Sequence, residues 1–260
     1  MDIAVLYTDA SLLAISKPAG LSVHEAPGPG SSVLRELREG QGLSGLTPVH
    51  RLDKDASGVL LLAKSKEIAA LLQSLWSRAE KTYWAICEGV PPQTSGTIDA
   101  LLLEHQTGKP ERLANAVRYY KKTHPDAPLP PLPAPKSSAV HVAGRSAQTD
   151  YRLIESFGRW SWLEVRPHQG RMHQIRVHLA HLGCPLAVDT LYGRRKVLLA
   201  RDLSSESGEP DAVILSRMPL HAAKLAFPDP RKSERLISVE APLPADMEKL
   251  LIVLRAGAHP

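Results

Sequence analysis

The chain has 260 residues, of which 43% are hydrophobic and 23% are charged, a composition that excludes wholesale disorder and allows one large domain or two small ones. Lys and Arg number 32 against 27 Asp and Glu, and this small excess fits a polyanionic partner without establishing one. No apolar run exceeds the length of 59–63, which is far shorter than the roughly 18 residues of a membrane span. Two Cys make no disulfide framework, so we expect a cytoplasmic protein with no membrane partner.

Short runs of alternating or continuous apolar residues predict a chain rich in strands. Thr8-Asp9-Ala10-Ser11 predicts a turn after the first strand, and Lys17-Pro18-Ala19-Gly20 ends the second because proline cannot continue a strand ladder. The run 59–63 has no polar residue and therefore predicts a strand buried on both faces. The expected strands are 3–7, 12–16, 59–63, 82–88, 97–103, 149–153, 162–166 and 236–239.

Serine and glycine mark the ends of the expected helices. Pro27-Gly28-Pro29-Gly30 predicts a loop, after which Ser31 or Ser32 can cap a helix. Gly183 stands where a residue of left-handed conformation would end another helix. Apolar residues recur at helical spacing between these signals. The expected helices are 33–39, 65–76, 172–182 and 244–254.

The stretch 109–144 differs from the rest in composition. Six prolines between 125 and 135 exclude regular structure over that segment. We interpret 109–144 as an exposed insertion, because strand-like residues resume at 149–153. Short strands, scattered helices and the lack of regular βαβ alternation predict an α+β fold on a largely antiparallel mixed sheet.

The segment His50-Arg51-Leu52-Asp53-Lys54-Asp55-Ala56-Ser57-Gly58 places charged groups directly before the buried strand 59–63. A rigid strand can hold reactive side chains at its end within a narrow tolerance. A polar turn, in which Asp53 or Asp55 caps backbone N–H groups, explains the same residues at least as well. The segment by itself leaves both interpretations open.

A second polar cluster, 166–178, joins a strand to an amphipathic helix through Gly170. We expect Arg171 at the N-terminus of that helix, where anions are attracted. Arg176 follows about a turn and a half later, where it can pair with a buried carboxylate or lie on a solvated basic face. The histidines of this region lack the ligand spacing of a zinc site, and the chain has no P-loop or GxGxxG segment, so we expect no metal and no cofactor.

Five segments in a fixed order resemble the motifs of the RluA-type family of RNA pseudouridine synthases. Any one of them is a weak signal, and the ordered set is a strong one. The resemblance covers about residues 3–240. Ala56, Gln169 and Met172 depart from the family's usual residues, and these departures concern fine positioning and not the chemistry. The five segments are His50-Arg51-Leu52-Asp53 with Ser57-Gly58, 170–179, Lys17-Pro18-Ala19-Gly20 with Val23-His24, Lys81-Thr82-Tyr83 and 147–151.

The resemblance implies the pseudouridine synthase fold. We expect a single catalytic domain over 1–260, with a central basic cleft and without an N-terminal RNA-binding accessory domain. The proline-rich part of the insertion, 124–136, is then either an RNA contact or a linker, and we favour a linker.

The resemblance also assigns the chemistry to three residues. Asp53 is the expected nucleophile, since an ordinary Asp has a pKa of about 3.9 and is ionised at neutral pH. Arg171 is the expected positive partner that keeps this carboxylate ionised. Tyr83 is expected to lie against the target base, with its hydroxyl near the proton lost from carbon 5. An ordinary half-buried strand residue is the competing interpretation of Tyr83.

Further residues are expected to bind the RNA. Arg51 would fill the gap that an extruded uridine leaves, Ile175 would form an apolar wall for the base, and Lys17 would contact phosphate. A salt bridge, helix packing and a solvated charge are the respective alternatives. The full expected set is Arg51, His50, Ile175, Lys17 and Arg176.

The function that the resemblance implies is a cofactor-free RNA pseudouridine synthase, an isomerase that acts on a stem-loop of rRNA or tRNA and is a monomer by default. An RNA-binding protein on the same fold without catalysis is one alternative, although binding alone would not require Asp53, Tyr83 and Arg171 together. A glycosidase is the other. The close spacing of Asp53 and Asp55 and the 5% of aromatic residues argue against it.

Overall fold

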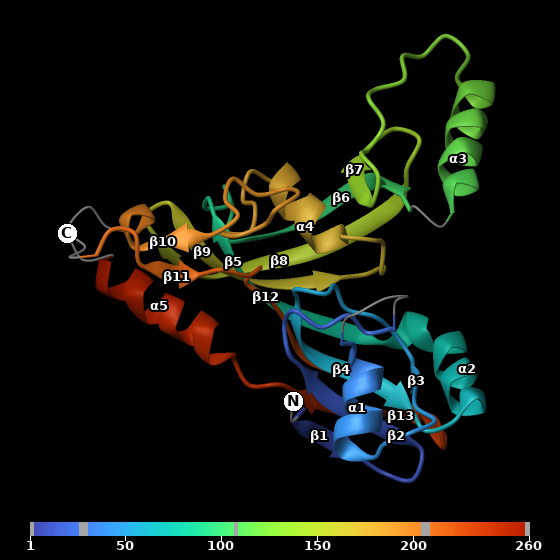
Figure 1. Ribbon diagram of the computed structural model, residues 1–260. Helices are drawn as coiled ribbons and strands as arrows, with labels where there is room; N and C mark the ends of the chain where they lie inside the picture. Colours follow the sequence, from blue (N-terminus) through green and yellow to red (C-terminus); the bar gives the residue numbers. More distant parts are fainter. Residues whose placement is uncertain (1–2, 26–30, 107–108, 204–208, 258–260) are drawn as a thin grey trace. The chain divides into compact units, whose positions relative to one another are not determined.

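A computed structural model describes residues 3–25, 31–106, 109–203 and 209–257 (Figure 1). The predicted loop 27–30 lies outside the described residues. The chain divides into two compact units: unit 1 comprises Met1–Ala85 and Val197–Pro260, and unit 2 comprises Ile86–Lys196. The single catalytic domain expected over 1–260 stays a prediction.

Unit 1 is built on a mixed sheet with the strand order β1-β2-β4-β12-β5, to which β3 adds by pairing with β4 and β13 by pairing with β12. Strands β4 and β12 run parallel, whereas the other pairings of this sheet are antiparallel. A separate antiparallel pair, β10 and β11, belongs to the same unit. The strands are β1 (Val5–Thr8), β2 (Leu12–Lys17), β3 (Thr47–Pro48), β4 (Ser57–Ala63), β5 (Glu80–Glu88, whose last three residues belong to unit 2), β10 (Leu198–Leu199), β11 (Val213–Leu215), β12 (Leu220–Asp229) and β13 (Lys232–Glu240).

Strand β4 is buried along its whole length, as its uninterrupted apolar run predicts. Its alternate residues enter two different hydrophobic clusters. Val59 and Leu61 pack with Phe227 on one face, while Leu60 and Leu62 pack with other residues on the opposite face. The strand therefore forms the centre of unit 1, and the polar segment that precedes it is attached to the most rigid part of this unit.

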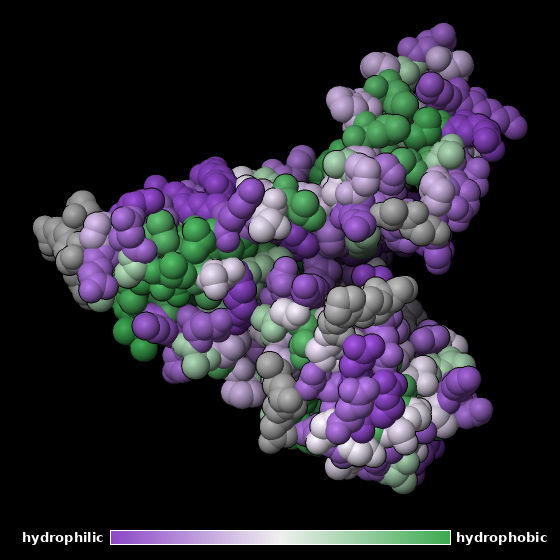
Figure 2. Space-filling view, viewed as in Figure 1, coloured by the Kyte–Doolittle hydropathy of each residue, from purple (hydrophilic) through white to green (hydrophobic). Residues whose placement is uncertain are grey.

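Helix α1 begins at a predicted serine cap, and α2 begins close to its predicted start, also after a serine. The Ser32 side chain accepts from Arg35 N at the start of α1 (Val33–Gln41), and the Ser65 side chain accepts from Ile68 N at the start of α2 (Lys66–Ser74). Helix α1 buries Val33 and Leu37, and its outer surface is hydrophilic (Figure 2). The last helix, α5 (Ala245–Gly257), lies close to the predicted range.

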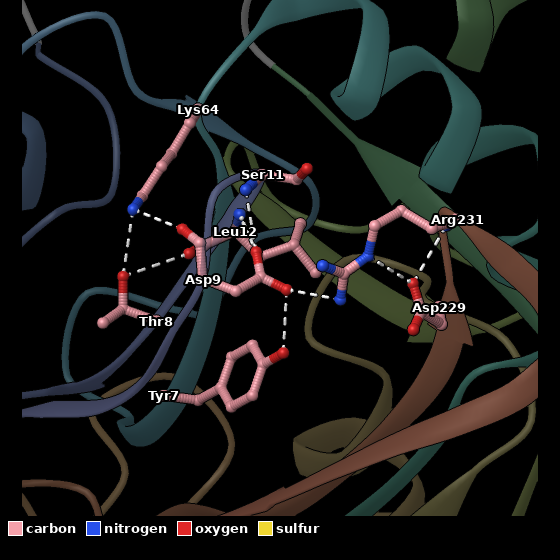
Figure 3. Close-up of polar contacts among 8 residues, drawn as sticks. All are labelled: Tyr7, Thr8, Asp9, Ser11, Leu12, Lys64, Asp229 and Arg231. Atoms are coloured by element: carbon pink, nitrogen blue, oxygen red, sulfur yellow. Dashed lines mark hydrogen bonds and ion pairs between the residues drawn. The ribbon is translucent and has the colours of Figure 1, made fainter.

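The predicted turn after β1 is held by Asp9 (Figure 3). Its carboxylate accepts from the backbone N–H groups of Ser11 and Leu12 at 2.8 Å and from the Tyr7 hydroxyl at 2.8 Å. Arg231 donates to the same carboxylate at 2.8 Å, so this one side chain ties the β1–β2 hairpin to the β12–β13 hairpin.

Unit 2 contains an antiparallel sheet with the strand order β9-β8-β6-β7. Helix α4 (Gln174–His181) packs on it through Val177, which contacts Leu102 and Ala147 in a small buried cluster. Gly183 follows α4 with a φ of 85°, as predicted for the residue that ends this helix. The strands of unit 2 are β6 (Ser95–His105), β7 (Ser137–Val140), β8 (Arg145–Phe157) and β9 (Trp160–Pro167).

Two expectations for unit 2 are wrong in detail. Helix α4 begins at Gln174 because His173 has a left-handed φ of 56°, so Arg171 lies in the loop before the helix and not at its N-terminus. The insertion 109–144 contains a helix that was not predicted, α3 (Pro110–Thr123). Its proline-rich part, 124–136, has no regular structure, as expected.

Both units combine antiparallel strand pairs with separate helices, which confirms the α+β class. Over the ranges that the structure describes, no helix has the length and apolar character needed to cross a membrane.

Candidate active site

Asp53 lies in the loop that leads into β4. Its carbonyl accepts from Ala56 N at 3.2 Å, which closes a tight turn, and its side chain is half-buried. The neighbouring charged residues Arg51, Lys54 and Asp55 are exposed. Asp53 is therefore the least exposed of the charged residues in this loop.

Lys17 holds this loop through a hydrogen bond to the Lys54 carbonyl oxygen. Its side chain is 0% exposed, and its Nζ donates to the carbonyl oxygens of Pro18 and Leu21 at 2.8 Å and of Lys54 at 2.9 Å. Burial lowers the pKa of Lys17 to about 8, against the opposing effect of the nearby Asp55 and Asp53 charges. The predicted phosphate contact of Lys17 is wrong, because the three N–H donors of its ammonium group are used inside the protein.

Tyr83 is placed near Asp53 by β5. It pairs with Ala222 of β12 in the register of the sheet and packs against the hydrophobic cluster that contains Leu52, the residue before Asp53. Burial and the charge of Asp53 both raise the pKa of the Tyr83 hydroxyl. The structure thus brings together two of the three predicted catalytic residues, and it keeps the phenol protonated at neutral pH.

Gly58 explains the glycine of the first motif. Residues 57 and 58 pair in parallel with His221 and Ala222 of β12, and Gly58 has a φ of +112°. A Cβ atom at this position would lie 2.2 Å from the Ala222 carbonyl oxygen, so only glycine allows the two strands to approach here.

A group of polar side chains that was not predicted lies at the start of β4. The Ser57 hydroxyl is 2.9 Å from His221 Nδ1, and Arg217 donates to Asp246 at 2.5 and 2.6 Å. Together with Lys17 these side chains line a cavity of about 600 Å³. No local signal could have indicated it, because strand β12, which carries His221, was not predicted.

His50, predicted to bind substrate, has a structural role instead. Its ring stacks on Trp76 with the centroids 4.9 Å apart, and its Nε2 accepts from Leu61 N of β4 at 3.1 Å. Burial, together with the Lys81 charge, lowers the pKa of His50 to about 4. The neutral His50 ring, stacked on Trp76 and hydrogen-bonded to Leu61 N, fixes the start of the Asp53 loop.

Arg171 is held in the loop before α4. Its backbone N–H donates to Gln174 Oε1 at 3.0 Å, and its guanidinium contacts the Ser146 carbonyl oxygen at 3.4 Å. Burial and the charge of Arg145 lower the pKa of Arg171, while Glu104 opposes them. Arg171 belongs to unit 2 and Asp53 to unit 1, so their pairing stays a prediction.

Arg176 is also used internally. Its Nε and Nη2 donate to the two carboxylate oxygens of Asp189 at 2.7 Å, and its guanidinium lies 5.0 Å from the Tyr192 ring centroid. Both members of the ion pair are buried. Of the two interpretations of Arg176, pairing with a buried carboxylate is confirmed, and its predicted contact with substrate stays a prediction. Ile175 is buried on α4, and its role as a wall for the base stays a prediction.

Sequence comparison decides what kind of protein carries this arrangement. Residues 11–181 match the family described as RNA pseudouridylate synthase. An uncharacterized RNA pseudouridine synthase of Chloroflexus aurantiacus is 39% identical over 262 residues, which cover 94% of this chain and 67% of the relative. Ribosomal large subunit pseudouridine synthase D of Xanthomonas campestris is 35% identical, with 96% and 69% covered. The chain belongs to the RluA-type RNA pseudouridine synthases.

Solved structures agree with this family. Human RNA Pseudouridylate Synthase Domain Containing 4 superposes with a TM-score of 0.68 at 25% identity, covering 97% of this chain and 93% of that one. Human RNA Pseudouridylate Synthase Domain Containing 1, at 21% identity and a TM-score of 0.64, shares the fold over 100% and 97% of the two chains. As a member of the RluA-type family, the chain is an RNA pseudouridine synthase, an isomerase that acts on RNA.

Proposed function

We propose that this synthase converts a uridine of an rRNA or tRNA stem-loop to pseudouridine, with Asp53 as the nucleophile and Arg171 as its positive partner. The support of the Asp53 loop carries the proposal. Buried Lys17 fixes the carbonyl of Lys54, the residue after Asp53, and His50 fixes the other side of the loop on β4. A nucleophile needs such fixed surroundings, because small displacements cost large factors in rate.

Tyr83 supports the same reaction through its ring and its hydroxyl. The raised pKa of this phenol means that at neutral pH it offers a hydrogen-bond donor and an uncharged aromatic face. Both suit an uncharged pyrimidine base that must turn over before it rejoins the ribose through carbon 5. We place Tyr83 against the uracil, and Ile175 as a second, apolar contact.

The proposed substrate contact also requires the uridine to leave its stack. Extruding a base costs a few kcal/mol, and a side chain that fills the gap reduces that cost. Arg51 is exposed and two residues from Asp53, which suits this role. We propose RNA as the partner of a monomeric enzyme. Cys87 and Cys184 are free and buried, which fits the cytosol, where thiols stay reduced.

Tritium release tests the proposal. Transcripts of rRNA and tRNA that carry tritium at carbon 5 of uridine are incubated with wild type, Asp53→Asn and Asp55→Asn. Asp55 is the matched control, since it is exposed, lies in the same loop and undergoes the same change of charge. We expect release by wild type and Asp55→Asn, and a loss of at least about 1000-fold in Asp53→Asn.

Other outcomes identify the alternatives. RNA binding by wild type and Asp53→Asn with release by neither would favour a binding protein without catalysis. Liberation of free base or sugar without isomerisation would favour a glycosidase. Equal release by Asp53→Asn and wild type would remove Asp53 from the chemistry.

A further inference from the structure

Helix α3 of unit 2 is a helix without a buried residue. Its partly covered side chains, Leu113, Ala116, Val117 and Tyr120, follow helical spacing and form one face. In Figure 1 the helix projects beyond the end of the β6–β7 hairpin, with the proline-rich segment beside it. The opposite face of α3 is therefore free of contacts with the other described elements of its own unit.

That opposite face carries positive charge. Arg118 and Lys122 are exposed on it together with the acidic Glu111, and Arg112 is exposed at its edge. Asn115 accepts from Arg118 Nη1 at 3.3 Å. The whole helix has four basic residues against one acidic residue, Glu111, which gives +3 of the chain's net +5. Among the described residues, no carboxylate forms an ion pair with the basic side chains of α3.

Tyr119 is exposed beside this face, three residues before Lys122 and seven after Arg112, so both cations lie on its side of the helix. Its side chain is 71% exposed, the most exposed large apolar or aromatic side chain among the described residues. Figure 2 shows hydrophilic atoms over α3 and hydrophobic atoms over the neighbouring proline-rich segment. An exposed aromatic ring surrounded by cations is the combination with which proteins hold unpaired nucleotides.

The proline-rich segment that follows α3 is bound to neighbouring residues of unit 2. His105 Nδ1 is 2.9 Å from the Pro133 carbonyl oxygen, and His141 Nε2 is 3.0 Å from that of Pro130. Lys136 N donates to the His105 carbonyl oxygen at 2.8 Å. Prolines also restrict the backbone, so the part of this segment between Pro130 and Lys136 is held on the strands of its own unit. The interpretation of 124–136 as a linker stays a prediction.

We propose that the outer face of α3 is an RNA-binding surface, on which Arg112, Arg118 and Lys122 contact phosphates and Tyr119 stacks on an unpaired base. The inference rests on the proposed function and adds a contact distant in sequence from Asp53. RNA is favoured over an acidic protein because one RNA strand offers both phosphates for the cations and unpaired bases on which the exposed ring can stack.

Binding measurements test the surface. The probe is a fluorescently labelled tRNA transcript, and a labelled rRNA hairpin is the second probe, each titrated at KCl concentrations from about 50 to about 300 mM. The triple variant Arg112→Gln/Arg118→Gln/Lys122→Gln should reduce the slope of log affinity against log salt by about 2 to 3. Tyr119→Ser should weaken binding roughly five- to 150-fold with little change in the slope.

The matched control is Lys66→Gln/Lys232→Gln/Lys249→Gln, which removes the same charge from exposed positions of unit 1 and should change the slope less. Circular dichroism establishes that each variant is folded. Wild-type affinity and slope in both α3 variants would overturn the inference. So would equal loss in the control, or binding of a labelled polyglutamate peptide as tight as that of RNA.

Tritium release at saturating enzyme keeps this inference separate from the proposed function. The α3 variants should need a higher enzyme concentration than wild type to reach their maximal rate of release, while Asp53→Asn binds and does not release. If wild type itself releases none, the proposed function fails, whatever the α3 variants bind.

Discussion

Gly58 of β4 lies so close to Ala222 of β12 that a Cβ atom at position 58 would come within 2.2 Å of the Ala222 carbonyl oxygen. The two strands run parallel at this point, and Gly58 directly precedes the buried run of β4. The glycine of the first motif therefore allows β12, which pairs with Tyr83 of β5, to approach β4, which follows the Asp53 loop.

We expect Gly58→Ala to lower the free energy of unfolding by about 3 kcal/mol or more, because the new methyl group meets backbone and the φ of +112° is strained for alanine. Urea unfolding measures the change. Gly170→Ala is the control, since a Cβ atom there meets nothing within 4 Å and should cost less than about 0.5 kcal/mol. Equal stability of the two variants would contradict the close approach.

Lys17 should give the stability a pH dependence in the alkaline range. Its pKa of about 8 lies below the ordinary 10.5, so between these values the unfolded chain binds the proton that the folded protein has released. Stability therefore rises with pH in this window, and below pH 8 the full cost of the buried charge is present. Relative to Lys17→Met, wild type should gain about 1 to 2 kcal/mol between pH 8 and pH 10.

Urea unfolding at several pH values measures this gain. Lys54→Met, which removes an exposed lysine side chain from the same loop, should leave the pH dependence of wild type unchanged. If the difference in unfolding free energy between wild type and Lys17→Met stayed constant from pH 8 to pH 10, the pKa of Lys17 would not be lowered in the folded protein.

The ion pair between Arg176 and Asp189 should be strongly coupled. Burial alone would raise the pKa of Asp189, but the hydrogen bonds from Arg176 and from the backbone at Leu191 and Tyr192 lower it. Arg176→Met leaves this carboxylate buried and unpaired, which should cost about 3 to 5 kcal/mol. Asp189→Asn in the same background should recover part of the loss, and a double-mutant cycle measures the coupling. Strict additivity would contradict the pair.

Buried histidines should weaken the fold in mild acid. Burial lowers the pKa of His50, His178 and His221 to about 4 each, below the ordinary 6.5. As pH falls from 6.5 towards 4, the unfolded chain takes up protons that the folded protein does not, so stability is lost over this window. Each histidine should contribute about 1 to 2 kcal/mol between pH 7 and pH 5.

His178→Gln isolates one of these contributions. His178 is fully buried, with Nδ1 2.8 Å from the Thr149 hydroxyl, and the variant should lose less stability on acidification than wild type does. His24→Gln, at an exposed position, should follow wild type. The same acid slope in all three proteins would refute the assignment.

Local patterns predicted those elements whose cause is local. The apolar run of β4 and the serine caps of α1 and α2 each act within a few residues, so their positions follow from the sequence. Strand β12 was missed because its alanines, lysine and proline have no clear period. Helix α3 was missed because the prolines that follow it dominated the interpretation of the whole stretch.

The sequence indicated the candidate catalytic residues but not the contacts that support them. The order of the motifs indicated Asp53 and Tyr83. The roles of Lys17, His50 and Arg176 depend on partners brought from elsewhere in the chain, namely the Lys54 carbonyl, Trp76 and Asp189. A basic residue in the sequence does not reveal whether its side chain faces a substrate or a buried partner, and only for Arg176 was a buried partner among the interpretations.

The two separate chain segments of unit 1 affect the order in which the protein is assembled on the ribosome. Unit 2 is one continuous stretch and has all its strands once residue 196 has emerged. The sheet of unit 1 must wait for β12, which pairs with both β4 and β5. Until then the start of β4 and the unit 1 part of β5 lack the strand between them, which makes this interval the one in which aggregation, and protection by chaperones, matters most.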